Sequence, residues 1–267
     1  AAGEVGALIG DSGLAARARE LARNVRHRPD AGFDLVSGSA GDTLALVGLT
    51  ADVERLGPAA DLDQVGLAHG LSGWACALLE LYGVTGDPAY RDQAMDAFAA
   101  ERAWFDPEAC AWRGPRAQTT STSWCNGSVG IGLARLRAAE LAPQPHLLAE
   151  AGAALASVHA SVAALSSGRT TRWEQANSSV CHGLMGAADF LVEAAEVLGV
   201  PEHLLAAERI LDHCLANAGW VCGTLDGKET VGLFLGLAGI GAVCLRIAFP
   251  GRLPPVGLPV RAYSTSE

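Results

Sequence analysis

The sequence is poor in charge and has no cluster of basic residues. Asp, Glu, Lys and Arg together make up 18% of the 267 residues, whereas soluble domains average about a quarter. The formal net charge is −10. Such a chain gives nucleic acid or an anionic membrane little electrostatic attraction, so we expect neither as a partner. Half of the residues are hydrophobic, which is enough for a large core and excludes a disordered chain.

Membrane-spanning runs and a secretion signal are also lacking. No uninterrupted apolar stretch is long enough to cross a bilayer, and the first residues do not join a basic segment to an apolar one. The seven cysteines are odd in number and widely spaced, unlike the disulfide framework of a small secreted protein. We therefore expect a cytoplasmic protein with no membrane span, whose thiols are free to bind a metal.

The sequence does contain a repeat, in which the pattern G-x-x-G precedes a run of apolar, helix-forming residues. The five copies are residues 37–49, 69–83, 126–141, 182–199 and 235–248. Glycines three apart lie on one face of a helix's first turn, where they allow another backbone to come close. The residues after them are apolar nearly all round. Each copy therefore predicts a helix that is buried on most sides.

Segments of a different character lie between the copies. Residues 85–105, 145–165 and 201–219 have an amphipathic helical pattern, and Pro88 stands where a first helical turn is expected. The alternation of buried and amphipathic helices predicts an all-α fold, a double-layered α/α toroid with inner and outer helices. Strand signals are few, and the one short hairpin that we expect covers residues 219–227.

Two irregularities bear on the extent of this toroid. Residues 9–25 resemble an outer helix that has no inner partner, so the chain starts in the middle of a unit. Residues 50–64 occupy a place where a whole outer helix is expected. We interpret residues 1–267 as a single domain, incomplete at its N-terminal side and in its outer layer.

Potential metal ligands occupy equivalent places in two copies. Cys125 and Cys181 each lie two residues before the first glycine of their repeat, and His182 follows Cys181. If the inner helices enter the ring from one side, equivalent positions lie at the same height. Two thiolates and one imidazole form a ligand set for Zn²⁺ that leaves the fourth tetrahedral position open, as in catalytic zinc sites.

The first two copies add groups that could handle protons. His69 matches His182 in its place before the glycine, and Asp34 lies four residues before Gly38. They offer an acid/base group and a carboxylate to orient it. Each residue alone has a structural interpretation, because a cysteine can fill a core, a histidine can donate to a carbonyl and an aspartate can cap a helix. The occurrence of these residue types at equivalent positions of the repeats favours a functional site.

The other cysteines and histidines show no such relation, and we expect core or surface thiols and solvated imidazoles. They are Cys76, Cys110, Cys214, Cys222, Cys244, His27, His146, His159, His203 and His213.

The repeats resemble those of a known family. "GLAHGLSG" (66–73), "SWCNGSVGIGLARL" (123–136), "VCHGLMG" (180–186) and "GLFLGLAGIGAVCLRI" (232–247) look like the glycine-helix motifs of the lanthionine synthetase C-like family. "FDLVSGSAG" (33–41) and "ERAWFDPE" (101–108) most resemble the cyclase half of class II bifunctional lanthipeptide synthetases. The resemblance runs from about residue 10 to the C-terminus.

The resemblance implies a zinc-dependent cyclase. Its members are α/α toroids that add a peptide cysteine to a dehydroalanine or dehydrobutyrine, which forms a thioether ring. Carried over, it implies Zn²⁺ bound by Cys125, Cys181 and His182, with His69 and Asp34 nearby. The partner would be a dehydrated precursor peptide. Because the dehydratase half and the early repeats of a class II enzyme are missing, dehydration would fall to another chain or a missing domain.

Two other functions remain open at this point. The same zinc site could add glutathione or another thiol to a dehydrated residue. Alternatively, the chain could be a catalytically degenerate domain that binds a leader peptide or another synthetase subunit.

Overall fold

The computed structural model describes residues 35–36, 39–47, 63–115, 119–166, 177–216 and 220–258, together with Ser12, Gly13, Ala16, Arg17 and Glu20. The inner helices are α3 (Ser39–Val47), α4 (Leu71–Thr85), α6 (Ser128–Leu141), α8 (Leu184–Leu198) and α10 (Leu237–Ala248). The outer helices are α5 (Pro88–Arg102), α7 (Pro145–Ser166) and α9 (Pro201–Ala216). A short antiparallel hairpin joins β1 (Phe105–Asp106) to β2 (Ala111–Trp112).

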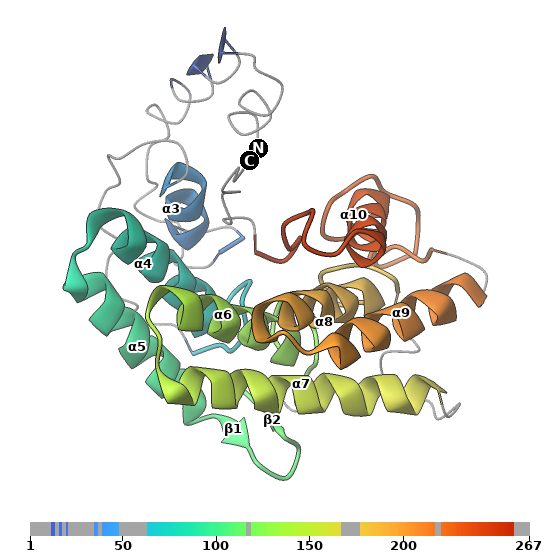
Figure 1. The fold of residues 1–267 in the computed structure, drawn as a ribbon, viewed down its shortest axis with the longest axis horizontal. Helices are drawn as coiled ribbons and strands as arrows, with labels where there is room; N and C mark the ends of the chain where they lie inside the picture. Colours follow the sequence, from blue (N-terminus) through green and yellow to red (C-terminus); the bar gives the residue numbers. More distant parts are fainter. Residues whose placement is uncertain are drawn as a thin grey trace.

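The predicted two-layered α/α toroid is confirmed. Three inner helices each pack against the outer helix that follows them, in the pairs α4–α5, α6–α7 and α8–α9. Inner helices contact one another in the order α3, α4, α6, α8 and α10, so they follow an arc with α5, α7 and α9 outside it (Figure 1). The core lies between the two layers, as the prediction of buried and amphipathic helices required.

The G-x-x-G pattern has a clear physical cause. Each inner helix with a complete description begins after an extended glycine, which is Gly70, Gly127, Gly183 or Gly236. The preceding loop doubles back, so that the amide of Ser128 donates to the carbonyl of Ser121 at 3.0 Å. A Cβ on Gly127 would overlap that same carbonyl. The glycines are therefore required by the loop that leads into each helix.

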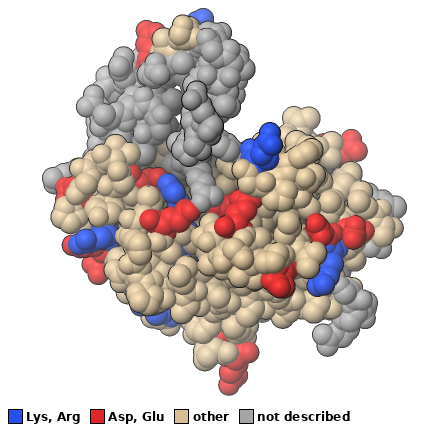
Figure 2. Space-filling model, in the orientation of Figure 1, with Lys and Arg blue, Asp and Glu red and all other residues tan. Residues whose placement is uncertain are grey.

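Charged residues at one repeat position link neighbouring inner helices. Glu80, Arg137, Glu193 and Arg246 each lie ten residues after the first glycine of their copy. Arg137 pairs with Glu80 at 2.6 Å, and Arg246 pairs with Glu193 at 2.8 Å. The alternation of acid and base thus ties α4 to α6 and α8 to α10. On the face drawn in Figure 2, the charged side chains are scattered among wide uncharged areas, in keeping with the low charge of the chain.

Some expectations differ from the structure. The predicted hairpin at 219–227 is wrong, because residues 220–227 form no strand. Two of their backbone groups bond instead to other loops, Val221 O to Ser178 N and Gly223 N to Leu235 O. The hairpin that does form connects α5 to the loop before α6. Nearly all of 9–25, and all of 50–62, lie outside the described residues.

One helix is long and apolar enough to cross a membrane, by length and composition alone. It covers Pro145–Leu165, with a mean hydropathy of 1.4. Half of it is buried, where α7 packs on α6 and α9. A helix that contributes to a core meets the same criterion, so the finding is weak support for a span.

Candidate metal centre

The loops that lead into the inner helices are joined at one height by backbone hydrogen bonds. The carbonyl of Cys125 accepts from Ala68 N at 3.1 Å. The carbonyl of Cys181 accepts from Trp124 N at 3.0 Å and from Cys125 N at 3.3 Å. The carbonyl of Phe234 accepts from Val180 N and Cys181 N. Equivalent positions of successive repeats therefore lie side by side, as the sequence register predicted.

This ladder brings the two predicted cysteine ligands together. Cys125 and Cys181 are free, half-buried thiols. Hydrogen bonding to the Cys181 thiol is the largest influence on Cys125 and lowers its pKa to about 6. The interaction with Cys125, reinforced by burial, raises the pKa of Cys181. The pair thus holds one thiolate readily and the second with difficulty, and a thiolate is the form of cysteine that binds metals.

Two further side chains act on Cys125. Its sulfur lies 3.4 Å from the hydroxyl oxygen of Ser123, and this contact also lowers the pKa of the thiol. The charge of His182 acts in the same direction. A thiolate at Cys125 is therefore supported by three neighbours from two repeats.

His182 itself is exposed, and its ring lies against the next loop. A Cβ built on Gly223 would stand 3.1 Å from Nε2 of His182, so the bare glycine backbone borders the imidazole. Among the described residues, no three Cys, His, Asp or Glu side chains are gathered closely enough to hold a metal ion. The donor types suit Zn²⁺ and two of the three predicted ligands interact. The complete ligand set remains a prediction.

The loop that carries His69 lies directly against Cys125. Gly66 has φ +99°, and a Cβ there would overlap the Cys125 carbonyl. The buried carboxylate of Glu101 fixes this loop by accepting from Gly66 N at 2.9 Å and from the Ser72 hydroxyl at 2.5 Å. His69 is partly buried and follows Ala68, whose amide donates to Cys125. The predicted acid/base group thus comes from the loop next to the thiols.

The fifth predicted residue, Asp34, lies outside the described residues. Its neighbour Leu35 is described, and the Leu35 amide donates to the carbonyl of Ala68 at 2.8 Å. The segment that follows Asp34 is thus tied to the loop of His69.

Two residues near the thiols were not singled out by sequence reasoning. Trp124 stacks on Phe234 with ring centroids 4.4 Å apart, and its indole nitrogen donates to Gly257 O at 3.0 Å. Asp189 is fully buried in α8. The available signal for Asp189 was a carboxylate inside the apolar run of residues 184–192, since buried charges require partners.

The remaining thiols agree with expectation, whereas one histidine pair does not. Cys76, Cys214 and Cys222 are buried, and Cys110 and Cys244 are partly exposed. His159 of α7 and His203 of α9 are only partly exposed, and their ring nitrogens Nε2 and Nδ1 lie 2.8 Å apart. Burial lowers the pKa of both imidazoles. The expectation of solvated rings is wrong for these two, because they join the outer helices.

Comparison with known proteins agrees with the fold and with the repeat. The family described as "Lanthionine synthetase C-like protein" matches residues 58–256. Among solved structures, nisin cyclase is similar, with a TM-score of 0.59 and 15% sequence identity over 90% of this chain and 71% of that one. No curated protein sequence matches. At this identity the structural likeness bears on the fold alone.

Proposed function

The chain belongs to the lanthionine synthetase C-like family, and on this premise we propose that it is a zinc-dependent cyclase that forms thioether rings in a dehydrated peptide. The observation that carries the proposal is the contact between two cysteines from different repeats, Cys125 and Cys181, at the entrance of the inner helices. The fold shared with nisin cyclase supports it. The proposed partner is a precursor peptide already dehydrated elsewhere, by a dehydratase on another chain or domain.

We infer that Cys125, Cys181 and His182 would hold the zinc ion. The low pKa of Cys125 supports this assignment, because the thiol gives up its proton near neutral pH. Bound by three protein ligands, zinc would supply an open position that favours ionisation of an incoming thiol. The half-burial of both cysteines keeps the sulfurs accessible to a peptide.

The protein's own residues would handle the proton of the reaction. The peptide sulfur forms a bond to the β-carbon of the dehydrated residue, and the electron pair of the double bond moves toward the carbonyl to give an enolate. A proton then returns to the α-carbon, so the product has the same composition as the substrate. We assign His69 to accept the thiol proton or to supply this last proton, with Asp34 orienting its ring. The position of the His69 loop beside Cys125 supports the assignment.

The hydrogen-bonded loops before the inner helices would also speed the reaction by holding the reacting groups close together. A cysteine and a dehydrated residue of one peptide, held at the same entrance, react as one molecule rather than two. The backbone bonds from Ala68 to Cys125 and from Cys125 to Cys181 keep the three loops at fixed separation. The site therefore suits intramolecular addition better than capture of two free reactants.

Ring formation can be tested with a synthetic peptide that contains one cysteine and one dehydroalanine. Cyclisation leaves the mass unchanged but removes the thiol, so a cyclised peptide takes up no iodoacetamide. The full chain with Zn²⁺ should protect the peptide from alkylation faster than buffer does, and Cys181→Ala should lose both this activity and zinc. Ring formation that survives Cys181→Ala would refute the zinc–thiolate proposal. Preferential addition of glutathione, offered in competition, would instead indicate an intermolecular transferase.

A further inference from the structure

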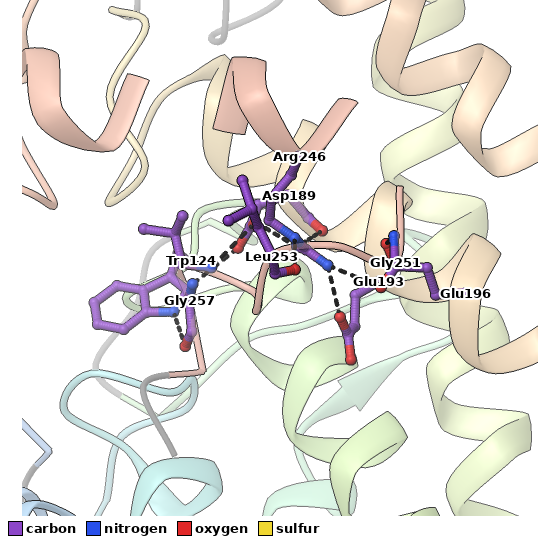
Figure 3. Close-up of polar contacts among 9 residues, drawn as sticks. Trp124, Asp189, Glu193, Glu196, Arg246, Gly251, Leu253 and Gly257 are labelled. Carbon is purple, nitrogen blue, oxygen red and sulfur yellow. Dashed lines mark hydrogen bonds and ion pairs between the residues drawn. The ribbon is translucent and has the colours of Figure 1, made fainter. Parts of the chain in front are cut away.

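The segment after α10 runs back to the inner helices as an irregular strap. This C-terminal strap covers Gly251–Leu258, and Figure 3 shows it between Arg246 of α10, Asp189 of α8 and Trp124 of the loop before α6. It contains no helix or strand, so its backbone polar groups need other partners. Several of those partners are side chains of the inner helices, and one is Trp124 of the loop before α6.

Asp189 holds the end of the strap near the metal-site loops. Its carboxylate accepts from Gly257 N at 2.8 Å and from Val256 N at 3.2 Å. Arg246 donates to Asp189 at 2.6 Å and to the carbonyl of Leu253 at 3.1 Å. Asp189 and Arg246 are buried almost completely. Hydrogen bonds to charged groups away from water are strong, so this end of the strap is firmly fixed.

The same glycine that Asp189 holds also contacts Trp124. The indole N–H donates to Gly257 O at 3.0 Å. A Cβ on Gly257 would lie 2.8 Å from Leu133 Cδ1 and 2.9 Å from Trp124 Nε1, so only glycine fits this contact. The next residue, Leu258, is buried in the core. The strap therefore helps to fix the position of the Trp124 ring.

Trp124 in turn belongs to the Cys125 loop and joins it to the Cys181 loop. Its amide donates to the carbonyl of Cys181, and the following amide, that of Cys125, donates to the same oxygen. Its ring stacks on Phe234, whose carbonyl accepts from the Cys181 amide. A continuous path thus leads from Asp189 through Gly257 and Trp124 to Cys125 and Cys181.

We propose that Asp189 is a positioning residue that, through Gly257 and Trp124, sets the separation of the Cys125 and Cys181 sulfurs. The importance of that separation for catalysis rests on the proposed function. The positioning itself does not, because it concerns two thiols whether or not a metal or peptide is bound. It can therefore be measured without activity.

Equilibrium formation of the Cys125–Cys181 disulfide in a glutathione buffer reports how well the two sulfurs are placed. Two thiols are oxidised while one glutathione disulfide is reduced to two glutathiones, so the equilibrium constant is an effective concentration of one thiol at the other. The full chain is equilibrated with chelator present, quenched with acid and alkylated, and the disulfide is located by peptide mass mapping. Asp189→Asn and Trp124→Phe should each lower the constant about tenfold, the size expected for loss of one hydrogen bond.

Two control variants separate positioning from general loss of stability. Trp112→Phe changes an equally buried tryptophan whose indole nitrogen has no hydrogen-bond partner among the described residues. Glu80→Gln removes the negative charge from the partly buried ion pair that Glu80 of α4 forms with Arg137 of α6. Both should keep the wild-type constant within about twofold, although Glu80→Gln should unfold at lower temperature.

The results decide whether the strap positions the two cysteines or only stabilises the fold. A constant that stays within about twofold of wild type in Trp124→Phe, despite a lower melting temperature, would overturn the proposal and leave the strap a purely structural element. If Asp189→Asn fails to fold, Gly257→Ala takes its place, since its Cβ must displace Trp124 or Leu133. Absence of ring formation by the wild-type protein would refute the proposed function and leave the disulfide result unaffected.

Discussion

The amide nitrogen of Cys125 lies 3.3 Å from the carbonyl oxygen of Cys181, although the two residues belong to different repeats. This backbone contact makes the interaction of the two thiols a consequence of the repeat itself. Every loop of the arc is joined to the next at the same position, so any residue type placed there faces its counterpart in the neighbouring copy. Two cysteines in adjacent copies therefore become a pair.

The requirement for glycine at a defined position of the repeat can be tested within one helix. A Cβ on Gly239 would overlap the carbonyl oxygen of Leu233, whereas a Cβ on Gly241 would meet nothing within 4 Å. We expect Gly239→Ala to lower the free energy of unfolding by about 1–3 kcal/mol through overpacking. Gly241→Ala, on the exposed side of the same helix, should raise it by about 0.5–1 kcal/mol. Urea unfolding curves of both variants measure the difference, and equal effects would contradict the role assigned to Gly239.

The buried charges should differ in their importance for stability. Arg246 serves Asp189 and Glu193, which are both buried, so Arg246→Met leaves two carboxylates without their cation. We expect a loss of about 3–5 kcal/mol in the free energy of unfolding. Arg137 is more exposed, with 18% of its side-chain surface accessible, and it pairs with Glu80, so Arg137→Met should cost clearly less. Denaturant titration gives both values. A larger loss for Arg137→Met would show that burial does not determine which ion pair contributes more to stability.

The histidine pair predicts a loss of stability in weak acid. Burial lowers the pKa of His159 and His203 below the ordinary 6.5 in the folded chain. As the pH falls through 6.5, the unfolded chain takes up protons that the folded pair resists, so the free energy of unfolding decreases. Urea midpoints at pH 7.5 and at pH 5.5 should therefore differ more for the wild type than for a His159→Gln/His203→Gln variant. Identical pH slopes would mean that the pair does not contribute.

His69 should be required for cyclisation but not for zinc binding. We expect His69→Ala to keep its zinc, since His69 is not among the proposed ligands, and to form rings at least about 100-fold more slowly, as expected for loss of a general acid or base. His146→Ala, which changes a partly buried histidine of α7, serves as the matched control and should retain full activity. A neutral effect of His69→Ala in every assay would favour the peptide-binding interpretation over the enzyme.

The sequence was sufficient to predict the inner helices and the neighbouring cysteines, because both follow from the spacing of the glycines. Gly127 and Gly183 mark helix starts, and positions counted back from them lie at one height. The contacts that orient the side chains could not be predicted in this way. The ring of His182 is bordered by Gly223 of the next loop. Asp189 meets Gly257 at a separation of 68 residues.

Such contacts leave little trace in a single sequence. The strap is held mainly through its backbone amides and carbonyls, which nearly every residue type has. The side chains of residues 251–258 therefore do not reveal these contacts. The hairpin between β1 and β2 has two-residue strands, which are too short to show the alternation that predicts a strand. The predicted hairpin at 219–227 was read from the same weak signals.

Zinc analysis of the purified full chain tests the central claim most directly. After exposure to Zn²⁺ and removal of the excess, the wild-type protein should retain about one equivalent, and Cys125→Ala and Cys181→Ala should each retain almost none, because a site with three protein ligands does not survive loss of a thiolate. Cys110→Ala, which removes a cysteine of the β1–β2 hairpin whose sulfur contacts the Ala153 carbonyl of α7, should bind like wild type. Zinc bound equally by the wild type and by either ligand variant would contradict a metal centre built on this cysteine pair.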